Sequence, residues 1–294
     1  MITRQIKELL QDRLRDILHS HIASIGYSAV GGGSINETYQ VKVNDHSHFF
    51  LKLNSNQRFS KLFEKEKNGL AFLAKQNCLP TPSVILCETG DDHQLLLLEW
   101  IEPGIRTNDF WKEFGGQLAQ LHHVSNDHFG FYEDNYMGSL PQQNTFTDNW
   151  IDFFIHRRLE PQIELAAGKH LLQKDHLALF EKLFIKLNSI FNTEKPSLLH
   201  GDLWSGNFMC NRQSLPVLID PAVYFGHRSM DLGMTTLFGG FDKTFYDAYR
   251  YYYPLPSNYS EQWEVCNLYP LLIHLNLFGS GYLHEILGTL KRFA

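Results

Sequence analysis

The chain has 294 residues, of which 43% are hydrophobic and 20% are charged, and its formal net charge at pH 7 is −6. This composition is typical of a folded globular protein with one large domain or two modest ones, and it excludes a disordered or fibrous chain. The negative charge and the lack of any run of Lys and Arg argue against a nucleic-acid partner.

Targeting signals are also missing from the sequence. The longest apolar stretches fall far short of the roughly 20 residues that a membrane-spanning helix needs, and residues 1–10 lack the apolar core of a signal peptide. The four cysteines are scattered without a CxxC pair, which argues against a zinc site or a dense disulfide framework. We therefore expect a cytoplasmic protein without a membrane partner.

The N-terminal third combines helix and strand patterns. Apolar residues at helical spacing predict helices over residues 3–22 and 59–75. Apolar runs bounded by turn residues predict strands over residues 39–43, 48–53, 84–88 and 94–101. We expect residues 1–101 to form the small lobe of a two-lobed α+β fold, with an antiparallel sheet and a helix.

Three consecutive glycines precede the first predicted strand. Without a Cβ, Gly31, Gly32 and Gly33 would let backbone N–H groups, and that of the following Ser34, approach the phosphates of a nucleotide. Asn36 stands in the place of the third glycine of a GxGxxG motif, and the chain has no Walker motif. Taken alone, the loop is a weak signal, and a flexible turn is its simplest interpretation.

A lysine and a glutamate occur where charges are unexpected. Lys52 lies inside an apolar strand, and Glu66 falls in the middle of the apolar stripe of the helix over residues 59–75. Because an unpaired buried charge is costly, we expect them to form the ion pair that holds a lysine on ATP phosphates in kinases. The alternative is that Glu66 lies at a loosely covered end of the stripe and is solvated.

The last predicted strand of the first lobe ends just before a Pro-Gly pair, where we expect the chain to enter the second lobe. Main-chain groups around Glu99, Trp100 and Ile101 would be placed to hydrogen-bond an adenine ring. Backbone recognition leaves no side-chain signature, so a simple buried edge strand is the alternative.

Beyond the first lobe, helical periodicity dominates and predicts a larger, mainly helical lobe over residues 102–294. The predicted helices include residues 110–121, 152–165 and 177–191. The exception is residues 198–222, where a polar, Gly-bearing loop is followed by a predicted hairpin.

The segment HGDLWSGN at residues 200–207 carries the strongest chemical signal, together with an aspartate beyond the hairpin. Phosphoryl transfer requires a carboxylate that accepts the proton of the attacking hydroxyl, and oxygen ligands that hold Mg²⁺ against the phosphates of ATP. Asp202 would be the base, and Asn207 and Asp220 would be the metal ligands. Each residue alone is also a common turn or cap residue, but the three together at this spacing indicate a kinase site.

Two neighbouring residues have open interpretations. His200 precedes a Gly-Asp turn, where a histidine is more often a backbone anchor than a metal ligand. Asp231 precedes an apolar run and would either cap a helix or brace the catalytic loop.

Two other functional classes fit part of the pattern. A metallophosphoesterase also places GD and GN close together, but its site needs a His after GN, and this chain has Phe208 there. A non-catalytic pseudokinase would be expected to have lost Lys52, Asp202 or Asp220, and all three are present.

Several segments resemble, in the same order, the fructosamine kinase family of the protein-kinase-like superfamily: GGGSINETY, FFLKLN, FEKEKNGLAFL, LLLLEWIE, DNYMGSLPQQN, HGDLWSGN, DPAVYFGHRSMDLGMTTLFGGF and LYPLLIHLNLFGSGY. Choline kinases and aminoglycoside phosphotransferases share HGDxxxxN but usually lack the Trp and the later block. The resemblance implies ATP- and Mg²⁺-dependent phosphorylation of the 3-hydroxyl of ketosamines, which are early glycation products of amines or protein lysines, as a deglycation repair step. It assigns the base, metal-ligand, phosphate-anchoring and adenine-binding roles to the residues already described.

Two positions concern regulation and acceptor choice. Some family members carry a Cys in the glycine loop that forms an intermolecular disulfide, whereas this chain has Ser34, so we do not expect that form of redox control. Trp204 would either contact the sugar or ammonium group of the acceptor or belong to the core. A phosphotransferase of the aminoglycoside or choline kinase type is the alternative function, because neither the acceptor pocket nor the oligomeric state follows from the sequence.

Overall fold

The structure, a computed structural model, describes residues 2–31, 35–44, 46–107 and 109–294. The chain divides into two compact units, one running to Ala71 and including Pro82–Glu102, the other made of Phe72–Thr81 and Pro103–Ala294. The first unit thus ends one residue after the expected boundary at residue 101, and residues 72–81 group with the second unit. No helix within the described ranges is long and apolar enough to cross a membrane.

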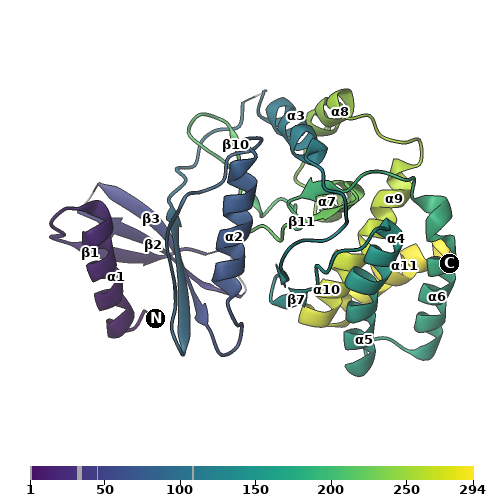
Figure 1. Cartoon of the computed structure of the whole chain (residues 1–294), viewed down its shortest axis with the longest axis horizontal. Coiled ribbons are helices and arrows are strands. Elements are labelled where there is room, and N and C mark those ends of the chain that lie inside the picture. The colour runs from purple at the N-terminus through teal and green to yellow at the C-terminus, as the bar shows by residue number, and fades with distance from the viewer. Residues whose placement is uncertain (1, 32–34, 45, 108) are drawn as a thin grey trace. The chain divides into compact units, whose positions relative to one another are not determined.

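The first unit is built on a five-stranded antiparallel sheet in the order β1-β2-β3-β5-β4 (Figure 1). Its strands are β1 (Ile25–Ala29), β2 (Glu37–Val43), β3 (Ser47–Ser55), β4 (Val84–Thr89) and β5 (His93–Glu99). The ends of the predicted strands differ from these by no more than two residues. The edge strand β1 was not predicted, because none of its residues is fully buried and its sequence lacks a clear apolar alternation.

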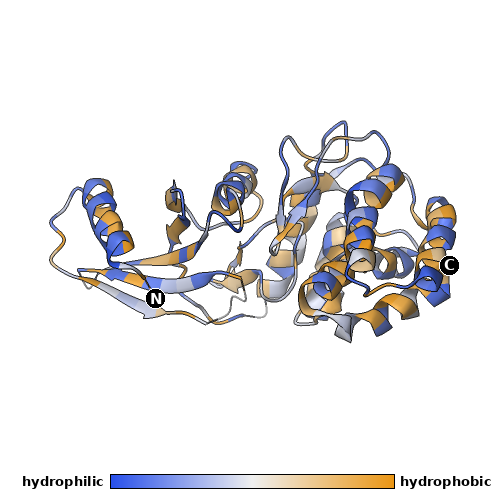
Figure 2. Ribbon diagram, turned by 90° about the horizontal axis from the view of Figure 1, so that it is seen from below, coloured by the Kyte–Doolittle hydropathy of each residue, from blue (hydrophilic) through white to orange (hydrophobic). Residues whose placement is uncertain are grey.

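Helix α1 (Arg4–Leu18) covers one face of this sheet. Thr3 caps the helix, since its Oγ1 accepts the N–H of Ile6 at 3.3 Å. The predicted helix over residues 3–22 is too long, because His19 adopts a left-handed φ of 47° and ends it. Figure 2 shows the alternation of hydrophilic and hydrophobic residues along the helices that is typical of amphipathic helices. The apolar side of α1 forms one core with the sheet, which includes Ile6, Leu10, Leu14, Val41, Leu51 and Leu97.

Helix α2 (Leu62–Lys75) contacts the opposite face of the sheet. Alternate residues of β3 join the α1 core, so Lys52 points to the other face, where it meets Glu66 of α2. The helix begins at Leu62 rather than at residue 59, since Lys61 has a left-handed φ of 57°. The buried Gln94 side chain of β5 accepts the N–H of Phe63 at 3.1 Å and fixes the start of the helix on the sheet.

The end of α2 belongs to the second unit. Leu73 and Leu79 are buried in the hydrophobic core of that unit, and the N–H of Leu218 donates to the carbonyl of Pro80 at 2.9 Å. These contacts explain why residues 72–81 group with the C-terminal part of the chain.

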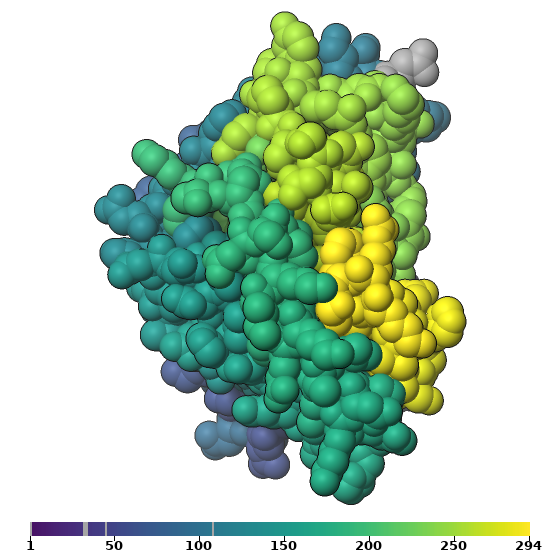
Figure 3. Space-filling view, turned by 90° about the vertical axis from the view of Figure 1, so that its right-hand side faces the viewer, coloured from purple at the N-terminus to yellow at the C-terminus, as the bar shows by residue number. Residues whose placement is uncertain are grey.

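The second unit is mainly helical, as predicted. Its helices are α3 (Phe110–His123), α4 (Trp150–Phe153), α5 (Glu160–Gly168), α6 (Lys174–Ile190), α7 (Ser229–Leu237), α8 (Lys243–Tyr252), α9 (Tyr259–Cys266), α10 (Leu268–Phe278), the short 3₁₀-helix η2 (Ser280–Tyr282) and α11 (Leu283–Phe293). Figure 3 shows α11, in yellow, packed beside α6, in green. Two-stranded pairs connect the helices: β6 (Asn135–Met137) with β7 (Leu140–Gln142), β8 (Ser197–Leu199) with β11 (Tyr224–Gly226), and β9 (Phe208–Cys210) with β10 (Pro216–Leu218).

The helix predicted over residues 152–165 is interrupted. Between α4 and α5 the chain forms a π-helix, η1 (Phe154–Leu159). Pro161 at the start of α5 has no backbone N–H to donate, which favours a change of hydrogen-bond pattern here. The π-helix carries Arg158, which is fully buried, with its guanidinium 4.0 Å from the centroid of the Tyr224 ring.

Candidate active site

The catalytic loop predicted from HGDLWSGN lies between β8 and the β9–β10 hairpin. The Asn207 side chain donates from Nδ2 to the main-chain oxygen of Asp202 at 2.8 Å and to its Oδ2 at 2.9 Å. In the hairpin, Phe208 pairs with Leu218, and the N–H of Ile219 donates to the Asn207 carbonyl at 3.1 Å. The register therefore brings Asp220 beside Asn207, and the structure unites the three residues predicted to carry the chemistry.

Gly201 allows the loop to approach the strand that follows the hairpin. Its φ is +86°, and a Cβ added there would lie 2.0 Å from the carbonyl oxygen of Ala222. The N–H of Ala222 donates to the His200 carbonyl at 2.8 Å. A side chain at position 201 would separate these two segments and displace Asp202.

His200 anchors the loop, as expected for the structural interpretation of this residue. The ring is fully buried, and burial lowers its pKa, so the imidazole is neutral. Its Nε2 donates to the carbonyl of Ile219 at 2.9 Å, and its Nδ1 accepts the N–H of Asp202 at 3.3 Å. Both ring nitrogens are thus engaged with the backbone, which excludes metal ligation in this arrangement.

Of the two interpretations left open for Asp231, the structure has the one in which it braces the predicted catalytic loop, and Asp231 is not the N-cap of a helix. Its two carboxylate oxygens accept the N–H groups of His200 at 2.7 Å and Gly201 at 2.9 Å. The residue lies within the first turn of α7 and is almost completely buried.

A buried histidine from α3, which the sequence did not single out, completes this support. His122 Nε2 lies 3.2 Å from Asp231 Oδ2, and His122 Nδ1 lies 2.8 Å from the hydroxyl of Tyr249 in α8. Burial lowers the pKa of His122, although Asp231 opposes that shift. The neutral ring therefore donates to Asp231 and accepts from Tyr249.

Asp202, the predicted base, lies in an environment that disfavours its charged form. The residue is half-buried, and burial raises the pKa of its carboxyl group to about 7. The hydrogen bond from Asn207 opposes this rise, and the nearby charges of Asp220 and Asp231 add to it. Such a pKa suits a carboxylate that accepts a proton near neutral pH.

Asn207 and Asp220, the two predicted metal ligands, lie beside Asp202. Both N–H groups of the Asn207 amide face Asp202, so its amide oxygen is the group left to bind a ligand. Asp220 has a φ of 55°, an uncommon conformation for a non-glycine residue that is often found at functional sites. Within the described residues, no group of three or more His, Cys, Asp or Glu side chains is arranged to hold a metal.

The first unit contains the predicted ion pair. Lys52 Nζ lies 2.7 Å from Glu66 Oε1, and only 3% and 11% of the two side chains are exposed. Glu66 is therefore not solvated. This buried pair places an oriented ammonium group on the face of the sheet that α2 covers.

The other predicted nucleotide contacts have mixed outcomes. Gly32, Gly33 and Ser34 lie outside the described residues, and an added Cβ on Gly31 would meet no atom within 4 Å. The N–H of Glu99 donates to the carbonyl of Ser83 at 2.9 Å, so it is not left for adenine. Trp100 and Ile101 follow the end of β5 without regular structure.

Trp204 has features of both predicted alternatives. It is half-buried and packs against the core of the second unit, with its ring centroid 5.7 Å from that of Phe238 in an edge-to-face contact. A Cβ added to Gly206 would lie 2.3 Å from the Trp204 ring, so glycine lets the ring lie against the catalytic loop. One side of Trp204 thus joins the core while part of the side chain remains accessible.

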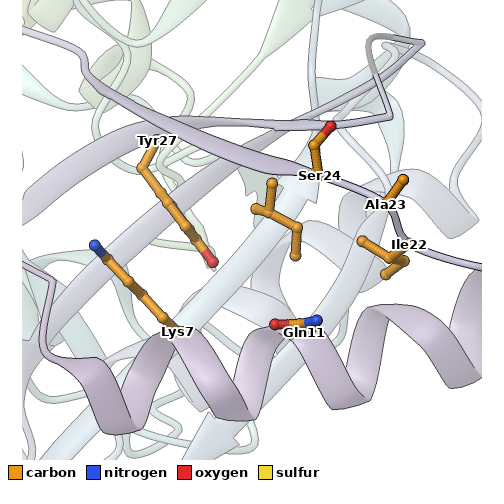
Figure 4. A pocket seen from close by; sticks show the side chains of 7 residues that line it. Lys7, Gln11, Ile22, Ala23, Ser24 and Tyr27 are labelled. Atoms are coloured by element: carbon orange, nitrogen blue, oxygen red, sulfur yellow. The ribbon is translucent and has the colours of Figure 1, made fainter.

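A hollow of about 220 Å³ lies between α1 and β1 (Figure 4). The side chain of Tyr27 points toward α1 between Lys7 and Gln11, and its buried hydroxyl has no hydrogen-bond partner within the described ranges. Burial raises the pKa of Tyr27 to about 12. Among the residues that the structure describes, the hollow is lined by none of those predicted to form the site.

Sequence comparison identifies the relatives of this chain. The model of the family described as fructosamine kinase matches residues 5–293. A probable ketoamine kinase from Enterococcus faecium is 39% identical over 268 residues, which cover 90% of this chain and 94% of that protein. A chloroplastic protein-ribulosamine 3-kinase from Oryza sativa subsp. japonica is 36% identical over 267 residues, which cover 87% of this chain and 75% of that protein.

Solved structures agree with this assignment. A crystal structure assigned to the fructosamine-3-kinases, from Haemophilus somnus, has a TM-score of 0.87 and 26% identity, covering 97% of this chain and 96% of that one. An amicoumacin kinase with 14% identity and a TM-score of 0.57, covering 99% and 96% of the two chains, shares the fold alone. The predicted two-lobed protein-kinase-like fold is thus confirmed, and the chain belongs to the fructosamine kinase family.

Proposed function

We propose that this chain is an ATP-dependent kinase that transfers a phosphoryl group to the 3-hydroxyl of ketosamines. The observation that carries the proposal is the Asp202 carboxylate, held by Asn207 at 2.9 Å on a loop that Asp231 braces. The names of the relatives, ketoamine kinase and protein-ribulosamine 3-kinase, support a ketosamine as the acceptor. Phosphorylation of such an adduct would be a deglycation step.

In this reaction the proton of the substrate 3-hydroxyl passes to a carboxylate oxygen of Asp202. The hydroxyl oxygen forms a bond to the γ-phosphorus of ATP, the bond from that phosphorus to the bridging oxygen breaks, and ADP leaves. General bases act best when their pKa lies near the working pH, and burial raises that of Asp202 to about 7. The bond from Asn207 to Oδ2 orients the carboxylate for this transfer.

We assign Mg²⁺ to the amide oxygen of Asn207 and the carboxylate of Asp220. Both are hard oxygen donors, and Mg²⁺ is usually held by one or two carboxylates plus substrate phosphates rather than by a complete protein cage. When bound, Mg²⁺ would neutralise negative charge on the phosphates. The β9–β10 hairpin would hold Asn207 and Asp220, the two proposed ligands, side by side.

We further propose that Lys52 anchors the ATP phosphates and that Glu66 orients it. The ion pair with Glu66 fixes where the Lys52 ammonium group lies, which suits a contact with the ATP phosphates. The glycine loop, from Gly31 to Ser34, would contribute backbone N–H groups to the phosphates. Main-chain groups of Trp100 and Ile101, together with the carbonyl of Glu99, would bind adenine.

Trp204 is our proposed contact for the acceptor. It follows the base by two residues, and its ring can cover the cationic amine or the apolar side of a linear sugar. A glycated protein lysine and a free ketosamine present the same chemistry at this position.

A screen of ADP release tests this function against the aminoglycoside and choline kinase alternative. The purified protein, ATP and Mg²⁺ would be combined with ribulosamines, fructosamines, choline and aminoglycosides, and the product analysed by phosphorus NMR. We expect turnover with ketosamines and phosphate on the 3-hydroxyl. Turnover with choline or an aminoglycoside but with no ketosamine would contradict the proposal.

A further inference from the structure

A continuous row of aromatic rings lies beside the catalytic loop in the second unit. The ring centroids of Trp204 and Phe238 are 5.7 Å apart, and those of Phe238 and His274 are 4.9 Å apart. His274 in turn lies 5.0 Å from Tyr282 and 5.5 Å from Phe278. We call Trp204, Phe238, His274, Phe278 and Tyr282 the aromatic row.

The aromatic row begins two residues after the proposed base and ends at the surface. Phe238 follows α7, His274 and Phe278 lie on α10, and Tyr282 ends η2. Phe278 is 53% exposed and Phe238 is 39% exposed, whereas most other aromatic side chains of this unit are buried. Neighbouring exposed aromatic rings next to an active site are typical of a ligand-binding surface.

The aromatic row is neutral at its centre. His274 Nδ1 lies 2.7 Å from the carbonyl oxygen of Pro270, so this nitrogen carries the proton and donates. Burial lowers the pKa of His274, and the ring therefore stays uncharged at neutral pH. Uncharged rings attract both a substrate ammonium group and hydrocarbon.

The chemistry of a ketosamine fits a surface of this extent. Its amine nitrogen is bonded to C1, so ordinary bond lengths put it roughly 4–5 Å from the 3-hydroxyl oxygen. With that hydroxyl at Asp202, the substituent on the nitrogen must extend beyond the sugar. Along the row, the rings from Trp204 to Phe278 are separated by steps of 5.7, 4.9 and 5.5 Å, so a long substituent is needed to reach Phe278.

We infer that Phe278 and Tyr282, at the far end of the aromatic row, bind an apolar substituent on the amine nitrogen of the ketosamine. The two residues thereby select among acceptors that share one sugar but carry different amines. This inference rests on the proposed ketosamine kinase function. It adds that the amine part of the substrate is recognised, and that these two side chains recognise it.

The test compares two acceptors with the same sugar in the wild type and in Phe278→Ala. One is an N-methyl ketosamine, and the other, called the benzyl adduct, carries on its nitrogen a long alkyl chain that ends in a benzyl group. Loss of one aromatic contact should lower kcat/KM for the benzyl adduct by roughly three- to tenfold. The methyl adduct should change by less than about twofold, because it cannot reach Phe278. Phe278→Tyr, which keeps the ring, should restore the preference for the benzyl adduct.

Tyr251→Ala is the matched control, because Tyr251 is 80% exposed on α8 and outside the aromatic row. It should leave both acceptors unchanged. An unaltered ratio of benzyl to methyl adduct in Phe278→Ala would overturn the inference while leaving the kinase function intact. Should Phe278→Ala fold poorly, Tyr282→Leu is measured in its place, with the same expected loss for the benzyl adduct. Failure of the wild type to phosphorylate either adduct would refute the proposed function and the inference with it.

Discussion

The carboxylate of Asp231 accepts the main-chain N–H of His200 at 2.7 Å and so fixes the backbone of the catalytic loop from a residue 31 positions later in the chain. The second oxygen of Asp231 accepts the N–H of Gly201 at 2.9 Å. Asp202 follows directly, so its position depends on this carboxylate.

We expect Asp231→Asn to lower both the free energy of unfolding and kcat. An amide can accept with only one atom, so one buried N–H loses its partner, which costs about 1–3 kcal/mol. We expect kcat to fall by roughly tenfold or more, because each 1.4 kcal/mol of lost transition-state stabilisation is a factor of ten. The KM for ATP should change little. Asp247→Asn, at an exposed carboxylate of α8, is the control, and equal behaviour of the two variants would refute the bracing role.

The Lys52–Glu66 pair should behave as one unit. Removing either partner takes a buried hydrogen bond and an opposite charge away from the other, so Lys52→Met and Glu66→Gln should each cost on the order of 3 kcal/mol of unfolding free energy. The double variant should lose less stability than the two single variants lose together. Its loss of activity should likewise be smaller than the product of the two single losses. Urea denaturation and steady-state kinetics measure both quantities. Additive losses would show that the pair is not coupled.

Stability should decrease as the pH falls from about 6.5 toward about 4. Burial lowers the pKa of His227 to about 4, with Glu194 opposing the shift, so in this window the unfolded chain binds a proton that the folded chain does not. The unfolding free energy therefore rises with pH there, by up to about 3 kcal/mol for this residue. The unfolding free energy of His227→Gln, measured by denaturation, should depend less steeply on pH than that of the wild type. A wild type whose stability is flat across this window would contradict the account.

Asp220→Asn should weaken the response to Mg²⁺. With one negative charge removed from the proposed donor set, the Mg²⁺ concentration for half-maximal activity should rise several-fold. The increase in melting temperature produced by Mg²⁺ with ADP should shrink in the same variant, which gives a readout independent of turnover. Asp175→Asn, at an exposed aspartate of α6, should behave as the wild type. An unchanged Mg²⁺ dependence in Asp220→Asn would exclude this residue as a ligand.

The active-site segment was predictable because its parts are close in sequence. Asp202, Asn207 and Asp220 lie within one loop and hairpin, so spacing alone indicates that they meet. The Lys52–Glu66 pair was predictable for a different reason, since strand alternation and helix periodicity both place a charge on a buried face.

Long-range contacts and local backbone changes were not predictable. His122 is 109 residues from Asp231, and a single histidine in an amphipathic helix gives no sign of its partner. The left-handed residue that ends α1 and the π-helix before Pro161 alter the backbone without altering the apolar pattern around them. Phe238 follows α7, His274 and Phe278 lie on α10, and Tyr282 belongs to η2, so only the packing of the second unit brings these rings into one row.

The most direct test of the account is the turnover of a ketosamine by Asp202→Asn. This variant keeps the size of the side chain and removes the base, so we expect kcat to fall by about 10²–10⁴-fold. The melting temperature should stay close to that of the wild type, as should the affinity for ATP, because the Lys52–Glu66 pair is untouched. A folded Asp202→Asn protein that retains more than a tenth of the wild-type kcat would contradict the assignment of Asp202 as the base.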